Sequence, residues 1–324
     1  RQRQMCIRDR DMIAPVDATL KTDKKEGYVI VPEVKGTTIN KKEFWKKLNN
    51  SVLNLQEELV LEEENCYVNP KIKEDSKTLK KTLEHMKALK EIQITYTFGD
   101  KKEVLKGKEI CKWINISEGK AVVDEEQAAA YIKSLASEYN TAYKAKTLKT
   151  SWGSTVTIKG GNYGWKIDNA GELEQLKKDI EEGKDVTREP EYSQTANSHG
   201  ENDYGDTYVE INLTAQHLYF YKDGNLIVDS DFVSGNVSKG NGTPVGAYPV
   251  TYTERDATLK GENYASDVTF WMPYCGNVGM HDASWRSSFG GNIYKTSGSH
   301  GCVNLPYAAA KKIFCLLYTS PSPR

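Results

Sequence analysis

The sequence lacks three features that would assign it at once to a common class of protein. Lysine and arginine number 44 against 45 aspartates and glutamates, a formal net charge of −1, so nothing indicates binding to nucleic acid or to an anionic membrane surface. The six cysteines show no paired spacing, so no disulfide framework is predicted. No run of about 18 apolar residues occurs, and the chain as it stands is expected to contain neither a transmembrane helix nor a signal peptide.

The composition that remains is typical of a folded protein and fits an extracytoplasmic one. With 324 residues, 38% of them hydrophobic and 27% charged, the chain can bury cores for two or three domains. Its two ends, residues 1–10 and 315–324, instead resemble translated sequencing-adapter read-through, and we exclude them from the fold prediction. The native sequence is then expected to run from Asp11 to Phe314 and to lack both true termini.

Helices are expected to dominate the chain ahead of residue 193. Three capping-box-like pairs predict helix starts: Asn40 with Glu43, Asp124 with Gln127, and Asn169 with Glu172. Apolar side chains recur behind each pair at helical spacing, namely Phe44, Leu48 and Val52, then Ala128, Ile132, Leu135 and Tyr139, then Leu173, Leu176 and Ile180. Gly183 is predicted to end the third helix. Alternating apolar residues over 92–98 predict a strand, so residues 11–192 are predicted to form an α+β region of one or two modules.

The pattern changes after a stretch that is almost free of aliphatic residues. Residues 193–206 are rich in turn formers and are predicted to be a linker. Residues 208–213 then alternate, and 218–228 predict a hairpin with Asp223 and Gly224 at its turn. We therefore predict a multidomain chain, with an α+β N-terminal region followed by a mostly β, sandwich-like domain over residues 207–314.

The clearest chemical signal is the hexapeptide 299–304, Ser-His-Gly-Cys-Val-Asn, in which Cys302 follows His281 by twenty-one residues. A thiolate can attack a carbonyl carbon, an imidazole can take the thiol proton and return one to the leaving amine, and backbone N–H groups can hold the oxyanion. Residues 304–312 predict a helix start with Asn304 or Leu305 at its cap, so Cys302 is expected just before a helix N-terminus. The helix dipole there would lower the thiol pKa below its usual value of roughly 8.5. Gly301 is expected to permit a positive φ and the close approach of a substrate backbone.

These residues resemble the signature of the L,D-transpeptidases, the cysteine enzymes that cross-link bacterial peptidoglycan. Four further blocks are similar in the same order along the chain: 207–213 and 217–221 resemble the opening hairpin of that family, 243–248 its conserved turn, and 269–274 the strand that leads to the histidine. The front half, in particular 163–168 and the helix after it, resembles the peptidoglycan-binding region often found ahead of this catalytic domain.

The resemblance implies a role for each of several residues. Cys302 is the expected nucleophile and His281 the base and then the acid. The backbone carbonyl at Asp282 is expected to orient the imidazole, and the N–H groups of Gly301 and Cys302 to hold the oxyanion. Support is expected from Ser299, His300 and Asn304, and a pocket wall and mobile lid from Tyr274, Trp285, Gly290 and Gly291. The resemblance implies no cofactor and no metal.

The implied reaction releases the terminal D-alanine of a tetrapeptide stem and passes the acyl group to a side-chain amine of a second stem, which gives a 3→3 cross-link. The implied partners are donor and acceptor stem peptides of peptidoglycan and carbapenem-type inhibitors. The implied location is extracytoplasmic, at the cell wall or the outer face of the membrane, with membrane attachment only through an anchor that this chain lacks. Family members continue past the helix after the cysteine into a final strand, so the catalytic domain is expected to be truncated.

Other interpretations of the same residues stay open. Cys275, His281, His300 and Cys302 could form a zinc site, although the paired spacing typical of zinc ligands is absent. Cys302 could be a buried small hydrophobe, although its neighbours are polar. His281 alone would be a structural histidine more often than a base, and Asn304 serves equally well as a helix cap. Water as the acceptor would make the chain an L,D-carboxypeptidase, and an inert catalytic domain would make it a cell-wall-binding protein.

Overall fold

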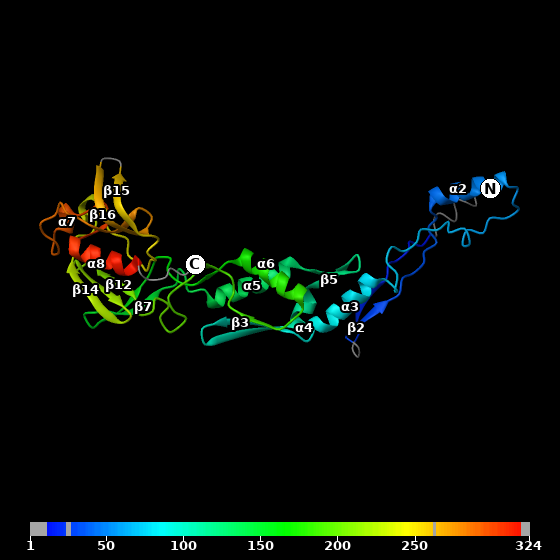
Figure 1. Cartoon of the computed structure of the whole chain (residues 1–324), viewed down its shortest axis with the longest axis horizontal. Coiled ribbons are helices and arrows are strands. Elements are labelled where there is room, and N and C mark those ends of the chain that lie inside the picture. Colours follow the sequence, from blue (N-terminus) through cyan, green and yellow to red (C-terminus); the bar gives the residue numbers. More distant parts are fainter. Residues whose placement is uncertain (1–11, 24–26, 262–263, 319–324) are drawn as a thin grey trace. The chain divides into compact units, whose positions relative to one another are not determined.

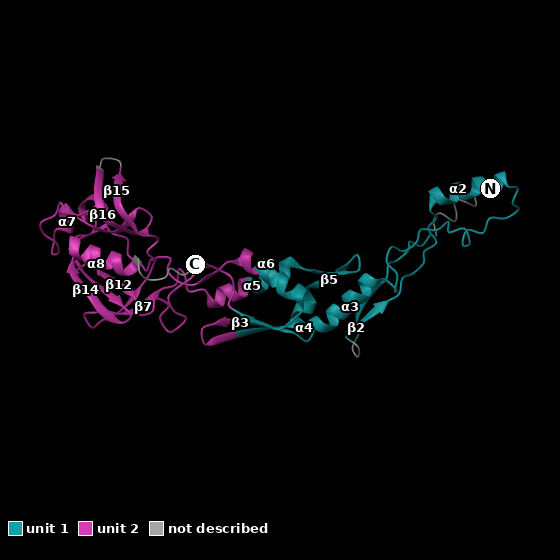
Figure 2. Cartoon of the chain, in the orientation of Figure 1, with its two compact units in different colours: residues 1–96, 103–132, 173–188 teal, residues 97–102, 133–172, 189–324 magenta. Residues whose placement is uncertain are grey.

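The computed structural model describes residues 12–23, 27–261 and 264–318 (Figure 1). The chain forms two compact units, residues 1–96, 103–132 and 173–188 in unit 1 and residues 97–102, 133–172 and 189–324 in unit 2 (Figure 2). The division falls inside two helices, α5 (Glu125–Tyr139) and α6 (Asn169–Glu182). The domain limits predicted from the sequence stay a prediction. Of the read-through predicted at 1–10 and 315–324, residues 1–10 and 319–324 lie outside the described residues.

The N-terminal half combines short hairpins with helices. Strand β1 (Thr19–Asp23) pairs with β2 (Gly27–Val31), and β5 (Ile114–Ser117) with β6 (Lys120–Val123), both antiparallel. A three-stranded sheet has the order β10 (Val186–Arg188), β3 (Gln93–Phe98), β4 (Lys101–Lys106), in which β10 runs parallel to β3. The further helices are α2 (Lys41–Leu53), α3 (Lys77–Leu89), α4 (Gly107–Ile110) and the 3-10 turn η1 (Cys111–Trp113).

Two of the three predicted helix starts are confirmed. Asn40 Oδ1 accepts from the N–H of Glu43 at 3.4 Å, and Asp124 Oδ1 from the N–H of Gln127 at 3.3 Å. These bonds satisfy donors that the first turn of a helix leaves without an intrahelical partner.

The third start was assigned to the wrong residue. Asp168, and not Asn169, caps α6, because its Oδ1 accepts from the N–H groups of Ala170 and Gly171 at 3.1 and 3.2 Å. The buried carboxylate of Glu172 accepts from the N–H of Glu191. The predicted end of the helix is confirmed at Gly183, which has φ +63°.

Burial follows the predicted patterns except in α2. The alternating residues of β3 are buried, and so are the apolar positions Ala128 and Ile132 of α5 and Leu176 and Ile180 of α6. In α2, Val52 is 64% exposed, so the periodic apolar positions of this helix do not form a buried face in the described part of the chain.

The segment predicted as a linker is instead packed within unit 2. Its first residues belong to β11 (Tyr192–Gln194), which pairs with β9 (Lys166–Ile167). The indole N–H of Trp165 donates to the carbonyl of Ser198 at 2.7 Å, and the buried Asp203 pairs with Lys146 of β7 (Lys146–Lys149). Buried polar pairs of this kind fix a backbone, so residues 193–206 do not form a free tether. Turn-rich composition was not sufficient evidence for a linker.

Residues 208–318 of unit 2 consist mainly of two sheets and a helix. Strands β12 (Tyr208–Asn212), β13 (His217–Lys222) and β14 (Asn225–Asp231) form an antiparallel sheet. Strands β15 (Glu254–Gly261), β16 (Tyr264–Cys275), β17 (Val278–Asp282) and β18 (Val303–Leu305) form the second, in which only the β17–β18 pair is parallel. The remaining elements are β8 (Thr155–Ile158), η2 (Val237–Lys239), α7 (Tyr294–Ser297) and α8 (Tyr307–Tyr318).

The apolar core of this part lies between the two sheets and α8. It joins Leu218 and Phe220 of the first sheet to Phe270 and Met280 of the second, and Ile313 of α8 packs with them. The predicted hairpin turn is confirmed, because Asp223 and Gly224 both have positive φ, at 49° and 77°. That conformation matches the right-handed twist of the flanking strands. The prediction of a multidomain chain with an α+β region followed by a mostly β domain is correct.

Helix α8 continues through the first residues of the predicted C-terminal read-through. It runs unbroken to Tyr318, and Leu316 and Leu317 pack partly against the core. The Lys222 ammonium also donates to the carbonyl of Leu316 at 3.1 Å. Residues 315–318 therefore take part in the fold whatever their origin.

An ion cluster joins β13 to β14. Nδ1 of His217 lies 2.6 Å from Asp231 Oδ1 and Nε2 lies 2.5 Å from Asp229 Oδ1. Because ionised carboxylates only accept hydrogen bonds, both contacts are hydrogen bonds only when the ring is imidazolium. Burial lowers the pKa of His217, but the bonds to Asp231 and Asp229 outweigh it and raise the pKa above its usual value.

The raised pKa predicts the pH dependence of this contribution to stability. The stabilisation is complete below the unfolded-state pKa of about 6.5 and is lost as the pH rises through the higher folded-state pKa. We expect His217→Gln to lower the thermal midpoint more at pH 6 than at pH 9, measured by circular dichroism against the wild-type chain. An equal loss at both pH values would contradict a charged His217.

Candidate active site

The second sheet places His281 and Cys302 on one face. His281 of β17 is paired with Asn304 of β18 and with Trp271 of β16. Cys302 precedes Asn304 by two residues in extended chain, and side chains two apart along a strand point to the same face. His281 is 3% and Cys302 8% exposed. Two predicted catalytic residues that are distant in sequence thus share a buried site.

The ring of His281 is fixed by a backbone carbonyl. Nδ1 lies 2.8 Å from the carbonyl oxygen of Asp282. A carbonyl only accepts, so Nδ1 carries the proton of the neutral ring and Nε2 keeps its lone pair. Burial lowers the pKa of His281, and the charge of Arg286 lowers it further against the opposing effects of Asp282. The neutral base is therefore the resting form at neutral pH.

The side chain of Asp282 has a different task. Its Oδ1 accepts from the N–H groups of Thr269 and Phe270 at 2.9 and 2.8 Å and so ties the end of β17 to β16. The carboxylate is buried and is used by these two bonds. The side chain of Asp282 therefore holds β17 to β16, whereas the backbone carbonyl of Asp282 orients the His281 ring.

The helix expected directly after Cys302 begins later than predicted. Strand β18 occupies 303–305 and α8 starts at Tyr307, so Asn304 is a buried strand residue and not a helix cap. The backbone of Asn304 pairs with β17 and with Val233, so this residue extends the sheet and does not cap the helix.

The expected lowering of the thiol pKa is also wrong. Burial raises the pKa of Cys302, and a backbone hydrogen bond from Gly279 offsets this only in part. The thiol donates to the carbonyl of Asn277 at 3.7 Å, as a protonated sulfur does. Burial therefore disfavours a resting thiolate at Cys302.

A network of short bonds shapes the turn before Cys302. Gly301 has φ +126°, a conformation open to glycine. Ser299 Oγ donates to the carbonyl of Cys302 at 2.5 Å and accepts from the N–H of Gly301 at 3.1 Å. Thr243 Oγ1 donates to the carbonyl of Gly301 at 2.7 Å. The N–H of Gly301, predicted to hold the oxyanion, is thus engaged by Ser299 in this state.

Sequence reasoning missed Thr243 as a site residue. Its block, 243–248, was matched to the family as a turn, and nothing in the local pattern indicates that its hydroxyl reaches Gly301 across 58 residues. The carbonyl of Asn277 and the N–H of Gly279 were missed for the same reason, since backbone groups leave no mark in a sequence.

The other predicted residues lie at different places around this turn. His300 is exposed, and Trp285 is 51% exposed with its ring centroid 5.9 Å from that of His281. Tyr274 belongs to the core cluster with Met280, on the face of the sheet away from His281. Gly290 and Gly291 both have positive φ, and the N–H of Gly290 donates to the carbonyl of Phe232. Trp285 is thus the predicted wall residue that the structure brings to the histidine.

Comparisons with known proteins identify two similar domains in this chain. Residues 206–320 match the family model of the L,D-transpeptidase catalytic domain, and residues 71–188 match the family described as "Putative peptidoglycan binding domain". A crystal structure of a cysteine-to-serine mutant of the Enterococcus faecium L,D-transpeptidase is 35% identical, over 73% of this chain and 96% of that chain, with a TM-score of 0.59. The chain belongs to the L,D-transpeptidase family.

A second solved L,D-transpeptidase structure, of the Ldtfm–avibactam carbamoyl enzyme, is 36% identical over 74% of this chain and 94% of that chain, with a TM-score of 0.59. The chain has no significant match among curated proteins. In the described residues of this L,D-transpeptidase, no helix is long and apolar enough to cross a membrane, and no group of three or more histidine, cysteine, aspartate or glutamate side chains is arranged to hold a metal ion.

The raised thiol pKa predicts the pH profile of thiol reactivity in this L,D-transpeptidase. Because the thiolate is the reactive form, alkylation of Cys302 by iodoacetamide should speed up as the pH rises through and beyond about 8.5, the value of a free thiol. Mass spectrometry of the peptide that contains Cys302 measures the rate at each pH. A rate already on a plateau at pH 6 would indicate a preformed thiolate and contradict the raised pKa of Cys302.

The two hydrogen bonds accepted by Asp282 Oδ1 predict that Asp282→Ala destabilises the protein more than Asp282→Asn does. Asp282→Ala leaves two backbone N–H groups without an acceptor and should reduce the free energy of unfolding by about 2–5 kcal/mol. Asp282→Asn keeps an oxygen at that place and should cost less. Urea denaturation of both variants measures the difference, and equal losses would mean that the two bonds to Asp282 Oδ1 are not what holds the strands together.

Proposed function

We propose that this protein forms 3→3 peptidoglycan cross-links through a thioacyl intermediate on Cys302. The observation that supports it is the position of Cys302 and His281 on one face of the catalytic sheet, with Nδ1 of His281 fixed by the Asp282 carbonyl. This arrangement lies inside the region that matches the L,D-transpeptidase catalytic domain.

In the first half-reaction the Cys302 thiol gives its proton to Nε2 of His281 as the sulfur attacks the carbonyl carbon of the third stem residue. The tetrahedral oxyanion is held by backbone N–H groups at the turn, that of Cys302 first and that of Gly301 once it leaves Ser299. Collapse of the intermediate breaks the peptide bond, and the His281 imidazolium returns the proton to the departing D-alanine nitrogen. The products are a thioester on Cys302 and free D-alanine.

In the second half-reaction a side-chain amine of another stem attacks the thioester carbonyl. His281 takes the proton of the attacking nitrogen, an amide bond forms, and the proton returns to the sulfur. Water in place of the amine would give the hydrolysed tripeptide. The implied partners are donor and acceptor stems, and the implied place of action is the extracytoplasmic cell wall. Carbapenem-type compounds are the implied inhibitors, and a relative forms a covalent carbamoyl enzyme with another inhibitor, avibactam.

The test uses a defined tetrapeptide stem with and without an amine acceptor, and mass spectrometry of the products. We expect a cross-linked dimer and D-alanine with the acceptor present. Cys302→Ala should abolish both products, whereas Cys275→Ala, a nearby cysteine of β16, should retain activity. His281→Ala should lower the acylation rate by about 10²–10⁴-fold, and His300→Ala should have a milder effect because that side chain is exposed.

Each alternative has its own outcome. Tripeptide without dimer, even with the acceptor present, would make the protein an L,D-carboxypeptidase. Absence of any acylation of Cys302 by a carbapenem would leave only cell-wall binding. Activity in Cys302→Ala with loss in Cys275→Ala would overturn the assignment of the nucleophile.

A further inference from the structure

The hydroxyl of Thr243 joins two backbone segments at the turn before Cys302. Its Oγ1 accepts from the N–H of Gly235 at 2.9 Å and donates to the carbonyl of Gly301 at 2.7 Å. A hydroxyl has a single hydrogen, so the donated bond fixes where that hydrogen points. The branched Cβ of Thr243 restricts its χ1 angle, which helps to keep the hydroxyl between the two segments.

The two segments lie too close together for a side chain between them. A Cβ added at Gly235 would lie 2.9 Å from the Cα of Gly301 and 1.8 Å from the carbonyl oxygen of Asn241. Gly235 is also bridged to Ser299, the first residue of the turn. The turn therefore rests directly against a fixed backbone, and Thr243 adds a side-chain bond that ties Gly301 to it.

The carbonyl that Thr243 holds belongs to the same peptide unit as the N–H of Cys302. This peptide bond is trans, so the unit is planar and its C=O and N–H point in opposite directions. Fixing the direction of the Gly301 carbonyl therefore fixes the direction of the Cys302 N–H. The N–H of Gly301, by contrast, is engaged by Ser299 Oγ at 3.1 Å, so the proposed mechanism uses the N–H of Cys302 first.

The bond from Thr243 also strengthens the donor at the other end of the peptide unit. A carbonyl oxygen that accepts a hydrogen bond draws electron density from its own amide, and linked hydrogen bonds polarise one another in this way. Gly301 and Cys302 are buried, and electrostatic interactions there are less screened than in water. Thr243 thus acts on the Cys302 N–H through both its direction and its partial charge.

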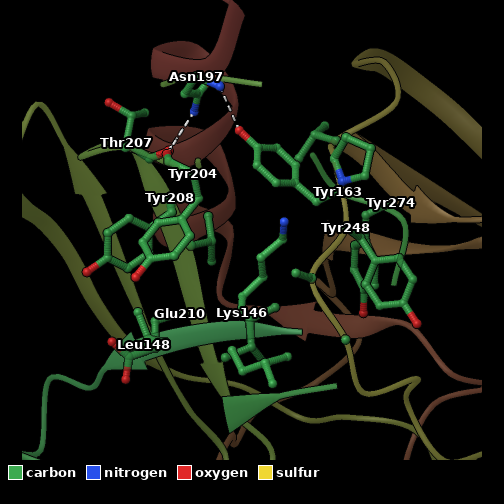
Figure 3. A pocket seen from close by; sticks show the side chains of 18 of the residues that line it. Lys146, Leu148, Tyr163, Asn197, Tyr204, Thr207, Tyr208, Glu210, Tyr248 and Tyr274 are labelled. Atoms are coloured by element: carbon green, nitrogen blue, oxygen red, sulfur yellow. Dashed lines mark hydrogen bonds between the residues drawn. The ribbon is translucent and has the colours of Figure 1, made fainter. Parts of the chain in front are cut away.

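The segment that carries Thr243 has anchors of its own. Residues 243–250 form part of the wall of a cavity of about 1210 Å³ in unit 2, which Figure 3 shows with Tyr163 beside it. The carbonyl of Ala247 accepts from the N–H of Tyr163 at 3.0 Å, and the N–H of Ala247 donates to the carbonyl of Gly160 at 3.2 Å. These bonds hold the segment in place independently of the Thr243 hydroxyl.

We propose that Thr243 is a positioning residue for acyl transfer, which holds the Gly301–Cys302 peptide unit so that the N–H of Cys302 meets the developing oxyanion. The inference rests on the proposed function, because the oxyanion forms when the Cys302 sulfur attacks a carbonyl carbon. Thr243 acts through the peptide unit that it holds and has no contact with the reacting atoms in this role.

The test compares two reactions of Cys302 in the full chain. In acylation by the carbapenem meropenem, the sulfur bonds to the β-lactam carbonyl carbon through a tetrahedral oxyanion, the ring C–N bond breaks, and the thiol proton passes by way of His281 to the ring nitrogen. In alkylation by iodoacetamide, the sulfur bonds to a CH₂ carbon, iodide leaves, and the thiol proton passes to solvent without any oxyanion. Mass spectrometry measures both rates, and a residue that positions an oxyanion donor affects only the first.

We expect Thr243→Val to slow acylation by about 10- to 100-fold, less than the loss of about 10²–10³-fold that follows removal of an oxyanion donor itself. Alkylation should keep its wild-type rate. Thr243→Ser retains the hydroxyl and should acylate at close to the wild-type rate. Thr82→Val is the matched control, because Thr82 also donates to a glycine carbonyl at 2.7 Å, that of Gly119, but within unit 1. It should acylate like the wild type.

A second variant, Thr243→Ala, removes the same hydroxyl without placing a methyl group against the Gly301 carbonyl, and it should show the same split between the two reactions. Circular dichroism checks that each variant is folded. Equal acylation rates for the wild type and both hydroxyl-free variants would overturn the positioning role, and so would an equal slowing of acylation and alkylation. Absence of acylation in the wild type would instead overturn the proposed function, and the positioning role with it.

Discussion

The parallel pairing of β17 with β18 is the constraint on which the active site depends. It sets His281 opposite Asn304 and thereby brings Cys302, two residues earlier in extended chain, to the same face. A shift of register by one residue would turn every side chain of β18 to the other face and would separate thiol from imidazole. The anchoring of β17 to β16 through Asp282 and the bridge between Val233 and Asn304 both hold this register.

The sequence predicted correctly those features that depend on residues close together in the chain. Asn40 and Asp124 were identified as helix caps because the bond they make spans three residues, and Asp223-Gly224 was identified as a turn because few other pairs adopt two positive φ angles. Cys302 and His281 were predicted as nucleophile and base by resemblance, from a motif and its surrounding blocks. The predicted fold class follows from the same patterns of period and turn.

The errors arose where tertiary contacts outweigh local preference. Asn304 was predicted to be a helix cap, but its backbone pairs with β17 in the second sheet. The pKa of the Cys302 thiol was expected to be lowered by a nearby helix terminus, but burial raises it. Residues 193–206 looked like a tether because they contain few aliphatic side chains, yet Asp203 and Lys146 form a buried pair that no composition rule reveals.

The burial of Cys302 has a consequence for the durability of the protein. Oxidants and disulfides react with the thiolate, so a buried sulfur whose pKa is raised is a poor target for sulfenic acid formation or mixed disulfides. The position of Cys302 in the sheet therefore protects its sulfur from oxidation.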